Sequence, residues 1–227
     1  MDLDALEKIL GTVFTDKNLL REALTHRSFL NEDPNTRQSN ERLEFLGDSV
    51  LSLLCSTELF KKFPDFPEGK LTNLRSAIVR TQTLGKVAKQ LNFGQFLLMS
   101  RGEEQGGGRE NLSLLADTFE AILGAIYLDS GLASAKVFLD KHLFSQIESL
   151  KNDQSIYDYK SRLQELVQNR EKLPPVYKVI REAGPDHAKT FTVTVFAGKD
   201  ELGRGVGKSK QEAEQEAARI ALDSITK

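Results

Sequence analysis

The stretch Asn40–Leu51, NERLEFLGDSVL, constrains the fold of this chain more than any other. Apolar residues recur in it at helical spacing and continue to Phe63, which predicts a long helix that is apolar on almost every side. Glu41, Glu44 and Asp48 interrupt this run and share one face, within an arc of about 60°. A solvated acidic stripe is the common explanation for such a pattern. The large apolar flanking residues favour instead carboxylates at the edge of a core, where a hard divalent cation offsets their repulsion.

A second acidic pair lies downstream in a similar apolar setting. A helical pattern begins at Asn111 and carries Asp117 and Glu120 on one face. Glu68 is a further carboxylate, at the start of another expected helix. If the two acidic helices pack face to face, their carboxylates converge. Oxygen ligands without a nearby histidine or cysteine favour Mg²⁺ or Mn²⁺ over zinc, and such sites usually serve phosphate chemistry.

Length and composition are those of an ordinary globular chain. Its 227 residues are 39% hydrophobic and 28% charged, which suggests one or two domains. No uninterrupted apolar stretch is long enough to span a membrane, and the N-terminus lacks the features of a secretory signal. The single cysteine, Cys55, allows no disulfide within the chain. It fits a small core residue in a protein of the reducing cytoplasm.

Net charge by itself argues against a nucleic-acid partner. The charge is −2 for the whole chain and divides into −4 over residues 1–150 and +2 over residues 151–227. A strongly basic chain would have pointed to nucleic acid. Bound metal ions, which the sequence does not count, would explain part of the negative charge of residues 1–150.

The periodicity predicts two domains of different class. Residues 1–150 show only helical patterns and form an all-α domain, and residues 151–155, KNDQS, are short and polar, as a linker would be. Residues 156–227 give a helix, three alternating strands and a helix, which is a small α+β domain of order α-β-β-β-α. Ser209 and Glu212 fit a capping box at the start of its last helix.

Three further expectations concern the all-α domain. One helix is expected from Glu68 to about residue 92, after a proline-rich break. The glycine-rich segment RGEEQGGGRE is expected to form a flexible exposed loop. A last helix is expected over residues 133–150, separate from the helix that carries Asp117.

These blocks resemble the ribonuclease III family. NERLEFLGDSVL is similar to the family signature, and the similarity extends to ALTHRS, PEGKLTNLRS and LLADTFEAILGAIYLD. Further on, DYKSRLQELVQ, GPDH and GKSKQEAEQEAA resemble parts of a double-stranded RNA-binding domain. Several distant blocks are a far more specific signal than one short motif. The resemblance covers essentially the whole chain and implies an all-α endonuclease domain followed by a small α+β double-stranded RNA-binding domain.

The resemblance also implies an activity and a set of site residues. The activity is hydrolysis of double-stranded RNA with Mg²⁺, or with Mn²⁺ in its place, leaving 5′-phosphate and 3′-hydroxyl ends. The implied metal site consists of Glu44, Asp48, Asp117 and Glu120. Among these, Asp48 and Glu120 are the residues most tied to catalysis.

Two other carboxylates, Glu41 and Glu68, match family residues with a supporting role in substrate handling. All six acidic positions hold the acid that the family pattern requires, so nothing in them indicates an inactive relative. The substrates that the resemblance implies are ribosomal RNA precursors and some messenger and transfer RNAs.

Phe45 lies at the rim of the acidic face, about 40° from Glu41 on the helical wheel, where a core residue is not expected. It is either tucked under a neighbouring helix or a contact with a second subunit. The two-fold dimer of the family favours the second reading. A homodimer with two-fold symmetry can present one site to each strand of a duplex.

Five residues of the second domain are candidate RNA contacts. Lys208 and Lys210 flank the start of the last helix, where basic side chains and free backbone N–H groups suit phosphate. Gln164 and Glu165 lie on the polar face of the first helix and could reach 2′-hydroxyls. His187, in the turn between two strands, could reach the minor groove.

Two other functions stay open at this stage. A binding module could keep the fold without cutting RNA, although the intact carboxylates argue against it. A metal-dependent hydrolase of small phosphorylated substrates would have the acidic helices but no use for the RNA-binding domain. His26 and His142 match no constellation and are interpreted as structural. The sequence leaves open the transcripts cut, the cleavage-site preference, the number of metals and the placement of the two domains.

Overall fold

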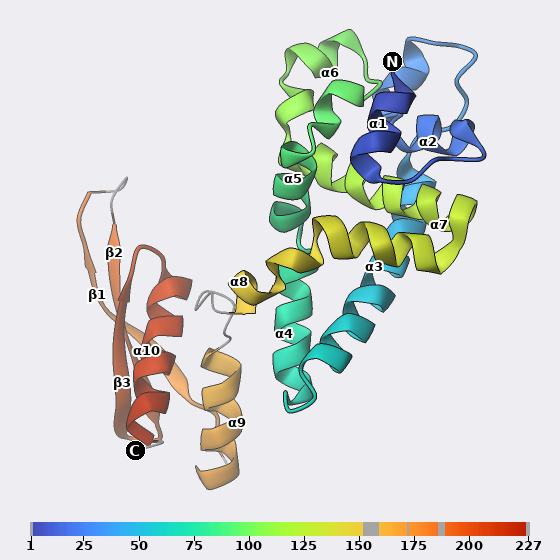
Figure 1. Cartoon of the computed structure of the whole chain (residues 1–227). Coiled ribbons are helices and arrows are strands. Elements are labelled where there is room, and N and C mark those ends of the chain that lie inside the picture. Colours follow the sequence, from blue (N-terminus) through green and yellow to red (C-terminus); the bar gives the residue numbers. More distant parts are fainter. Residues whose placement is uncertain (1, 152–158, 172, 186–188, 226–227) are drawn as a thin grey trace. The chain divides into compact units, whose positions relative to one another are not determined.

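The computed structural model describes residues 2–151, 159–171, 173–185 and 189–225 (Figure 1). By its internal contacts the chain divides into two compact units, Met1–Ile156 and Tyr157–Lys227. Of the expected linker, only Lys151 falls within these ranges, and it ends a helix. The candidate RNA contact His187 lies outside the described residues.

The first unit is helical, and within its described residues two segments pair only as a single β-bridge, between Thr25 and Leu98. Its α-helices are α1 (Leu3–Leu10), α2 (Lys17–Ala23), α3 (Glu41–Lys62), α4 (Glu68–Val79), α5 (Thr81–Gln90), α6 (Arg101–Gln105), α7 (Leu112–His142) and α8 (Ile147–Lys151). Short 3₁₀ helices are η1 (Arg27–Asn31), η2 (Phe93–Phe96), η3 (Gly108–Glu110) and η4 (Phe144–Gln146). The all-α prediction for this unit is confirmed.

Helices α3 and α7 form the centre of this unit, with α2 and α5 packed on α7 and α4 packed on α3 (Figure 1). Phe119 and Phe138 are fully buried between these elements, with ring centroids 5.2 Å apart. Cys55 is also fully buried, and burial raises the pKa of its thiol to about 12. The cysteine is therefore a core residue, as the sequence predicts, and stays a neutral thiol.

The crossing of α3 and α7 depends on two glycines that face each other. A Cβ atom on Gly47 would lie 1.8 Å from the carbonyl oxygen of Glu120, and one on Gly124 would lie 2.3 Å from the carbonyl oxygen of Leu43. Both distances are far below van der Waals contact, so only glycine fits at these two positions. The backbones of the two helices therefore touch, and Glu44 and Glu120 each lie one turn before the glycine of their own helix.

The long helix expected from Glu68 to residue 92 is wrong as a single element. The chain breaks at Arg80, whose ψ of 147° is extended, and α4 and α5 lie on either side. The Thr83 hydroxyl donates a hydrogen bond to the Ala77 carbonyl at 2.7 Å. It thereby satisfies a carbonyl that the continuing helix would have used.

The glycine-rich segment is also more ordered than expected. It forms α6, which Ser100 caps by accepting a hydrogen bond from the Glu103 N–H, and then η3. Arg109 donates from Nη1 to the carbonyls of Gly94 and Leu97, at 2.6 and 3.1 Å. These bonds hold the segment against η2. The prediction of a flexible loop is therefore wrong for this segment.

The helix expected over residues 133–150 is confirmed as distinct from the helix before it, but it ends earlier. Gly131, with a φ of 80° and a ψ of −179°, is not helical and divides α7 at a kink into two helical segments, of which the second ends at His142. The remaining residues form η4 and α8. By length and hydropathy α7 also meets the criteria for a membrane span, with 44% of its most apolar window buried in this unit. Its apolar residues pack against α2, α3 and α5.

The second unit is a small α+β domain, as predicted. Its elements are α9 (Tyr159–Glu171), β1 (Val176–Ala183), β2 (Thr190–Ala197), β3 (Asp200–Gly207) and α10 (Lys210–Ile225). The strands form one antiparallel sheet in the order β1-β2-β3, and α10 packs on β2, β3 and α9. Leu163, Val195 and Ala217 are among the buried residues of this core. The Ser209 hydroxyl accepts a hydrogen bond from the Glu212 N–H at 3.1 Å, as a helix cap does.

We expect Gly47→Ala to lower the free energy of unfolding by about 1–3 kcal/mol, because the added methyl group must push α3 away from α7. Gly69→Ala is the matched control, since Gly69 is helical and exposed, and a Cβ atom added to it would have nothing within 4 Å. Alanine there should be neutral or stabilising by up to about 1 kcal/mol. Urea unfolding followed by circular dichroism measures both variants. Equal stability of the two variants would contradict the close contact.

Candidate functional site

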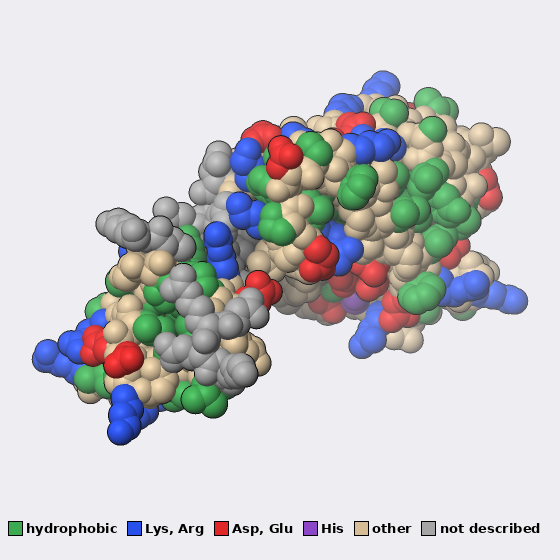
Figure 2. Space-filling model, turned by 90° about the horizontal axis from the view of Figure 1, so that it is seen from below, with side chains coloured by type: hydrophobic (Ala, Val, Ile, Leu, Met, Phe, Trp, Pro, Cys, Tyr) green, Lys and Arg blue, Asp and Glu red, His purple; other side chains and the backbone are tan. Residues whose placement is uncertain are grey.

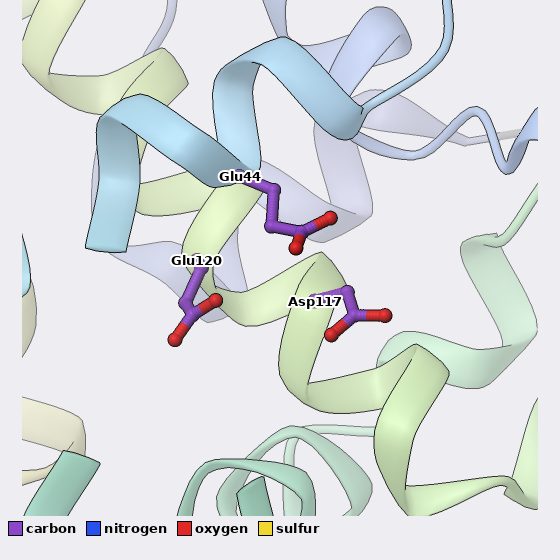
Figure 3. A group of neighbouring side chains, drawn as sticks. All are labelled: Glu44, Asp117 and Glu120. Carbon is purple, nitrogen blue, oxygen red and sulfur yellow. The ribbon is translucent and has the colours of Figure 1, made fainter. Parts of the chain in front are cut away.

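Three carboxylates converge where α3 crosses α7 (Figure 3). Glu44 comes from α3, and Asp117 and Glu120 come from α7. One oxygen of each lies within 4.8 Å of the others, and all three side chains are half-buried. The glycine contact produces this arrangement, because Glu44 and Glu120 each lie one helical turn before the glycine of their own helix. The predicted convergence of the two acidic helices is therefore found in the structure.

Burial raises the pKa of all three carboxylates of this site, and neighbouring acidic charges add to the rise for Glu44 and Glu120. Burial first, and then the charges of neighbouring carboxylates, raise the pKa of Glu120 to about 8. Burial is also the largest cause of the raised pKa of Glu44, again followed by neighbouring carboxylates. Crowded, half-buried acids of this kind are stabilised either by protons or by a cation. An all-carboxylate donor set fits a hard divalent metal such as Mg²⁺ or Mn²⁺, with Glu44, Asp117 and Glu120 as the ligands.

Asp48 and Glu41 flank the three carboxylates without joining them. Asp48 is exposed, and its charge contributes to the raised pKa of both Glu44 and Glu120. Glu41 lines a cavity of about 380 Å³ together with Glu44 and Asp117. Its carboxylate accepts a hydrogen bond from the Ser39 hydroxyl at 2.9 Å and lies 3.8 Å from the Arg27 guanidinium. Both residues are therefore close enough to influence a ligand of the site.

Glu68 is not brought to this cluster within one chain. It lies in the first turn of α4, where its carboxylate accepts a hydrogen bond from the Thr72 hydroxyl at 2.8 Å. Helix α4 begins just beyond the C-terminal end of α3 (Figure 1). At 1.5 Å per residue, that end lies about 27 Å along the helix from Glu44. Glu68 thus belongs to a different part of the surface of this unit.

His26 lines the site, although its sequence context predicts only a structural residue. The residue does have a structural role, because its Nδ1 accepts a hydrogen bond from the Ser28 N–H and so caps η1. The ring also lines the same cavity as Glu44 and Asp117. Figure 2 shows acidic side chains close together on one face of the helical unit. Only the long-range pairing of this segment with Leu98 positions His26, and no local sequence signal shows that pairing.

His142 keeps the structural interpretation. Its ring lies 5.1 Å from that of Phe138, and its buried Nε2 has no hydrogen-bond partner among the described residues. Burial lowers the pKa of this histidine. The ring of His142 is therefore neutral and packs inside the helical unit.

Phe45 is 79% exposed, so it is not tucked under a neighbouring helix. That alternative from the sequence analysis is wrong. A second cavity, of about 630 Å³, opens beside Phe45 and is lined by Leu19, Leu46 and Leu128 among others. An exposed aromatic ring next to an apolar cavity is typical of a protein contact surface.

The described RNA-contact candidates are exposed on the second unit. Gln164 and Glu165 lie on α9, and Lys208 and Lys210 lie at the start of α10. The ammonium group of Lys210 is 3.2 Å from the Glu182 carboxylate. The backbone N–H of Lys208 donates to Glu212 at 2.7 Å, and no described residue pairs with its ammonium group.

A helical unit with a carboxylate metal-type site, followed by an α-β-β-β-α unit, is the architecture of a nuclease that acts on structured RNA. Family models agree: residues 16–147 match a model described as ribonuclease-III-like, and residues 159–225 match the double-stranded RNA binding motif. The chain belongs to the ribonuclease III family. It is an endoribonuclease of the class that acts on double-stranded RNA.

Individual relatives agree over nearly the full length. Ribonuclease 3 of Roseiflexus sp. (strain RS-1) is 47% identical over 226 residues, which cover 98% of this chain and 95% of the relative. Ribonuclease 3 of Oceanobacillus iheyensis is 47% identical, with 99% of each chain covered. Among solved structures, the nuclease domain of ribonuclease III from Campylobacter jejuni is 45% identical with a TM-score of 0.60, covering 63% of this chain and 97% of that one.

We expect Glu120→Gln to stabilise the metal-free protein more at about pH 9 than at about pH 5. An unfolded glutamate loses its proton near 4.5, whereas folded Glu120 keeps its proton up to about 8. The folded state therefore holds the extra proton between these values, and wild-type stability falls as the pH rises through this window. Glutamine carries no charge at either pH, so the loss disappears. Thermal unfolding in EDTA measures the difference, and equal gains at both pH values would contradict it.

Proposed function

We propose that this endoribonuclease uses Mg²⁺, or Mn²⁺ in its place, held by Glu44, Asp117 and Glu120. The proposed reaction is hydrolysis of phosphodiester bonds in double-stranded RNA, leaving 5′-phosphate and 3′-hydroxyl ends. The observation that carries the proposal is the convergence of three half-buried carboxylates within 4.8 Å. Their raised pKa values mean that three ionised carboxylates are unfavourable here on their own. A bound cation would stabilise their ionised form.

The side chains have three proposed roles, which are binding the metal, accepting a proton and placing the substrate. When bound, a divalent cation supplies positive charge that offsets the charge developing on the phosphate group during hydrolysis. Asp48, exposed beside the ligands, is available to accept a proton from the attacking water. Glu41, held by Ser39 and Arg27, supports substrate placement at the neighbouring cavity. Glu68 has the same kind of role at the other end of α3.

A homodimer is the second part of the proposal. The exposed Phe45 and the apolar cavity beside it form one surface, and a two-fold axis would insert each ring into the cavity of the other subunit. The related Campylobacter jejuni domain is described as having a region involved in dimer formation. A dimer would also supply a second copy of Glu68, which one chain keeps away from its own cluster.

The remaining parts of the proposal concern substrates and setting. Residues 1–150 act as the catalytic domain, residues 151–155 as a linker and residues 156–227 as the domain that binds double-stranded RNA. Ribosomal RNA precursors, with some messenger and transfer RNAs, are the proposed substrates. The proposed place of action is the cytoplasm, with no membrane partner. A buried, neutral Cys55 is compatible with that reducing compartment.

A labelled RNA hairpin tests the activity. Wild type with Mg²⁺ should yield discrete fragments with 5′-phosphates, and EDTA should abolish them. Glu120→Gln should slow cleavage by at least about a hundredfold, which is the usual scale for removing a group that stabilises transition-state charge. If the hairpin is bound but never cut, the chain is a binding module. If a short nucleotide is hydrolysed faster than the hairpin, the preference for duplex RNA is refuted.

Phe45→Glu should halve the mass measured by light scattering, because two buried carboxylates at the two-fold axis would cost more than the contact gains. Val206→Glu is the control. It places the same charge on a residue that is 55% exposed in the second unit. An unchanged mass for Phe45→Glu would remove this residue from the interface.

Lys208→Ala should weaken binding of duplex RNA with little sequence dependence. It should also reduce the slope of log affinity against log salt by about 1, as expected for one lost phosphate contact. Lys199→Ala is the matched control, since this exposed lysine lies at the opposite end of β3, about 31 Å away at 3.4 Å per residue. Binding is measured in EDTA so that no cleavage occurs. Equal losses for the two variants would show a general charge effect.

A further inference from the structure

Hydrogen bonds fix the ring of His26 in one orientation. The Ser28 N–H donates to His26 Nδ1 at 3.3 Å, and the Ser28 hydroxyl lies 2.8 Å from the same nitrogen. This hydroxyl already accepts a hydrogen bond from the Ser100 N–H at 2.9 Å, so its own hydrogen is free to point at Nδ1. The Nδ1 atom is therefore an acceptor. In the neutral ring the hydrogen must then sit on Nε2.

The ring of His26, whose Nδ1 is engaged by Ser28, lines the cavity beside the carboxylates. The ring of His26 lines this cavity together with Glu41, Glu44 and Asp117. No described residue accepts a hydrogen bond from Nε2, and the atom is not among the buried polar atoms that lack a partner. The ring that carries this donor therefore shares one cavity with Asp117.

Asp117 has an oxygen to spare for such a donor. Figure 3 shows one oxygen of its carboxylate on the side of Glu120 and the other pointing away. Only one oxygen of each acid is needed for the group of three that lies within 4.8 Å. None of the residues that the structure describes donates a hydrogen bond to the Asp117 carboxylate. Carboxylates that bind metals are usually held by hydrogen bonds to their second oxygen.

We propose that His26 is a positioning residue of the metal site, whose Nε2–H donates to the Asp117 oxygen that does not bind the cation. The inference rests on the metal site of the proposed function. Ser28 and Ser100 contribute by holding the ring in the required tautomer. The cap of η1 and the ligand Asp117, far apart in the sequence, are thereby joined through one side chain.

Two substitutions separate this role from the capping of η1. His26→Asn keeps an acceptor close to the position of Nδ1 and removes the donor at Nε2. His26→Gln places an amide N–H near the position of Nε2 and removes the capping acceptor. A structural role alone predicts that the glutamine variant is the more damaged of the two. A positioning role predicts the opposite for metal affinity.

The test is calorimetric titration of the full, RNA-free chain with Mg²⁺ and with Mn²⁺, alongside thermal unfolding in EDTA. His26→Asn should bind the cations about 10–100-fold more weakly than wild type, the usual effect of losing a residue that orients a ligand. His26→Gln should bind within a few fold of wild type while unfolding at a lower temperature. Wild-type affinity in His26→Asn, or an equal loss of affinity in both variants, would overturn the inference.

The same experiment distinguishes this inference from the proposed function. Wild type that binds no cation would overturn both. Wild type that binds the cation and cleaves the hairpin, with His26→Asn unchanged in affinity, would overturn the role of His26 alone. Binding by wild type with the expected loss in His26→Asn supports the inference whether or not the chosen hairpin is cut.

Discussion

The contact between the backbones of α3 and α7 is the constraint on which the site depends. With Gly47 against the Glu120 carbonyl and Gly124 against the Leu43 carbonyl, the two helices approach as closely as their backbones allow. Side chains one turn before each glycine are then forced together, and these are Glu44 and Glu120. The spacing of these carboxylates is set by rigid helices instead of by loops, which is the arrangement that holds functional groups most accurately.

The same close approach of α3 and α7 has an electrostatic cost. Close packing of the helices brings the acids together and also removes much of their water, so their pKa values rise. A bound cation would restore the free energy lost to repulsion, and it would compete with protons for the same oxygens. The flanking groups, Asp48, Glu41 and His26, lie at the edge of the cluster, where solvent is still accessible.

Much of this architecture follows from the sequence, because helical periodicity places acids on a face and an apolar surrounding implies that the face packs. The two classes of domain and the convergence of Glu44 with Asp117 and Glu120 were predictable on that basis. Tertiary contacts decided the rest. The break at Arg80 depends on a hydroxyl that reaches back to Ala77, and the position of His26 depends on its pairing with a segment far along the chain. Neither the hydrogen bond to Ala77 nor the pairing near His26 can be read from the spacing of residue types along the sequence.

The burial of Cys55 has a practical consequence. Its thiol is fully enclosed and has a pKa of about 12, so almost none of it is thiolate near neutral pH. Thiol reagents act on the thiolate, and they need access as well. Since the sequence has one cysteine, a second cysteine introduced at an exposed position becomes the single reactive thiol of the native fold. A fluorophore or spin label can therefore be attached at one chosen point without first replacing a core residue.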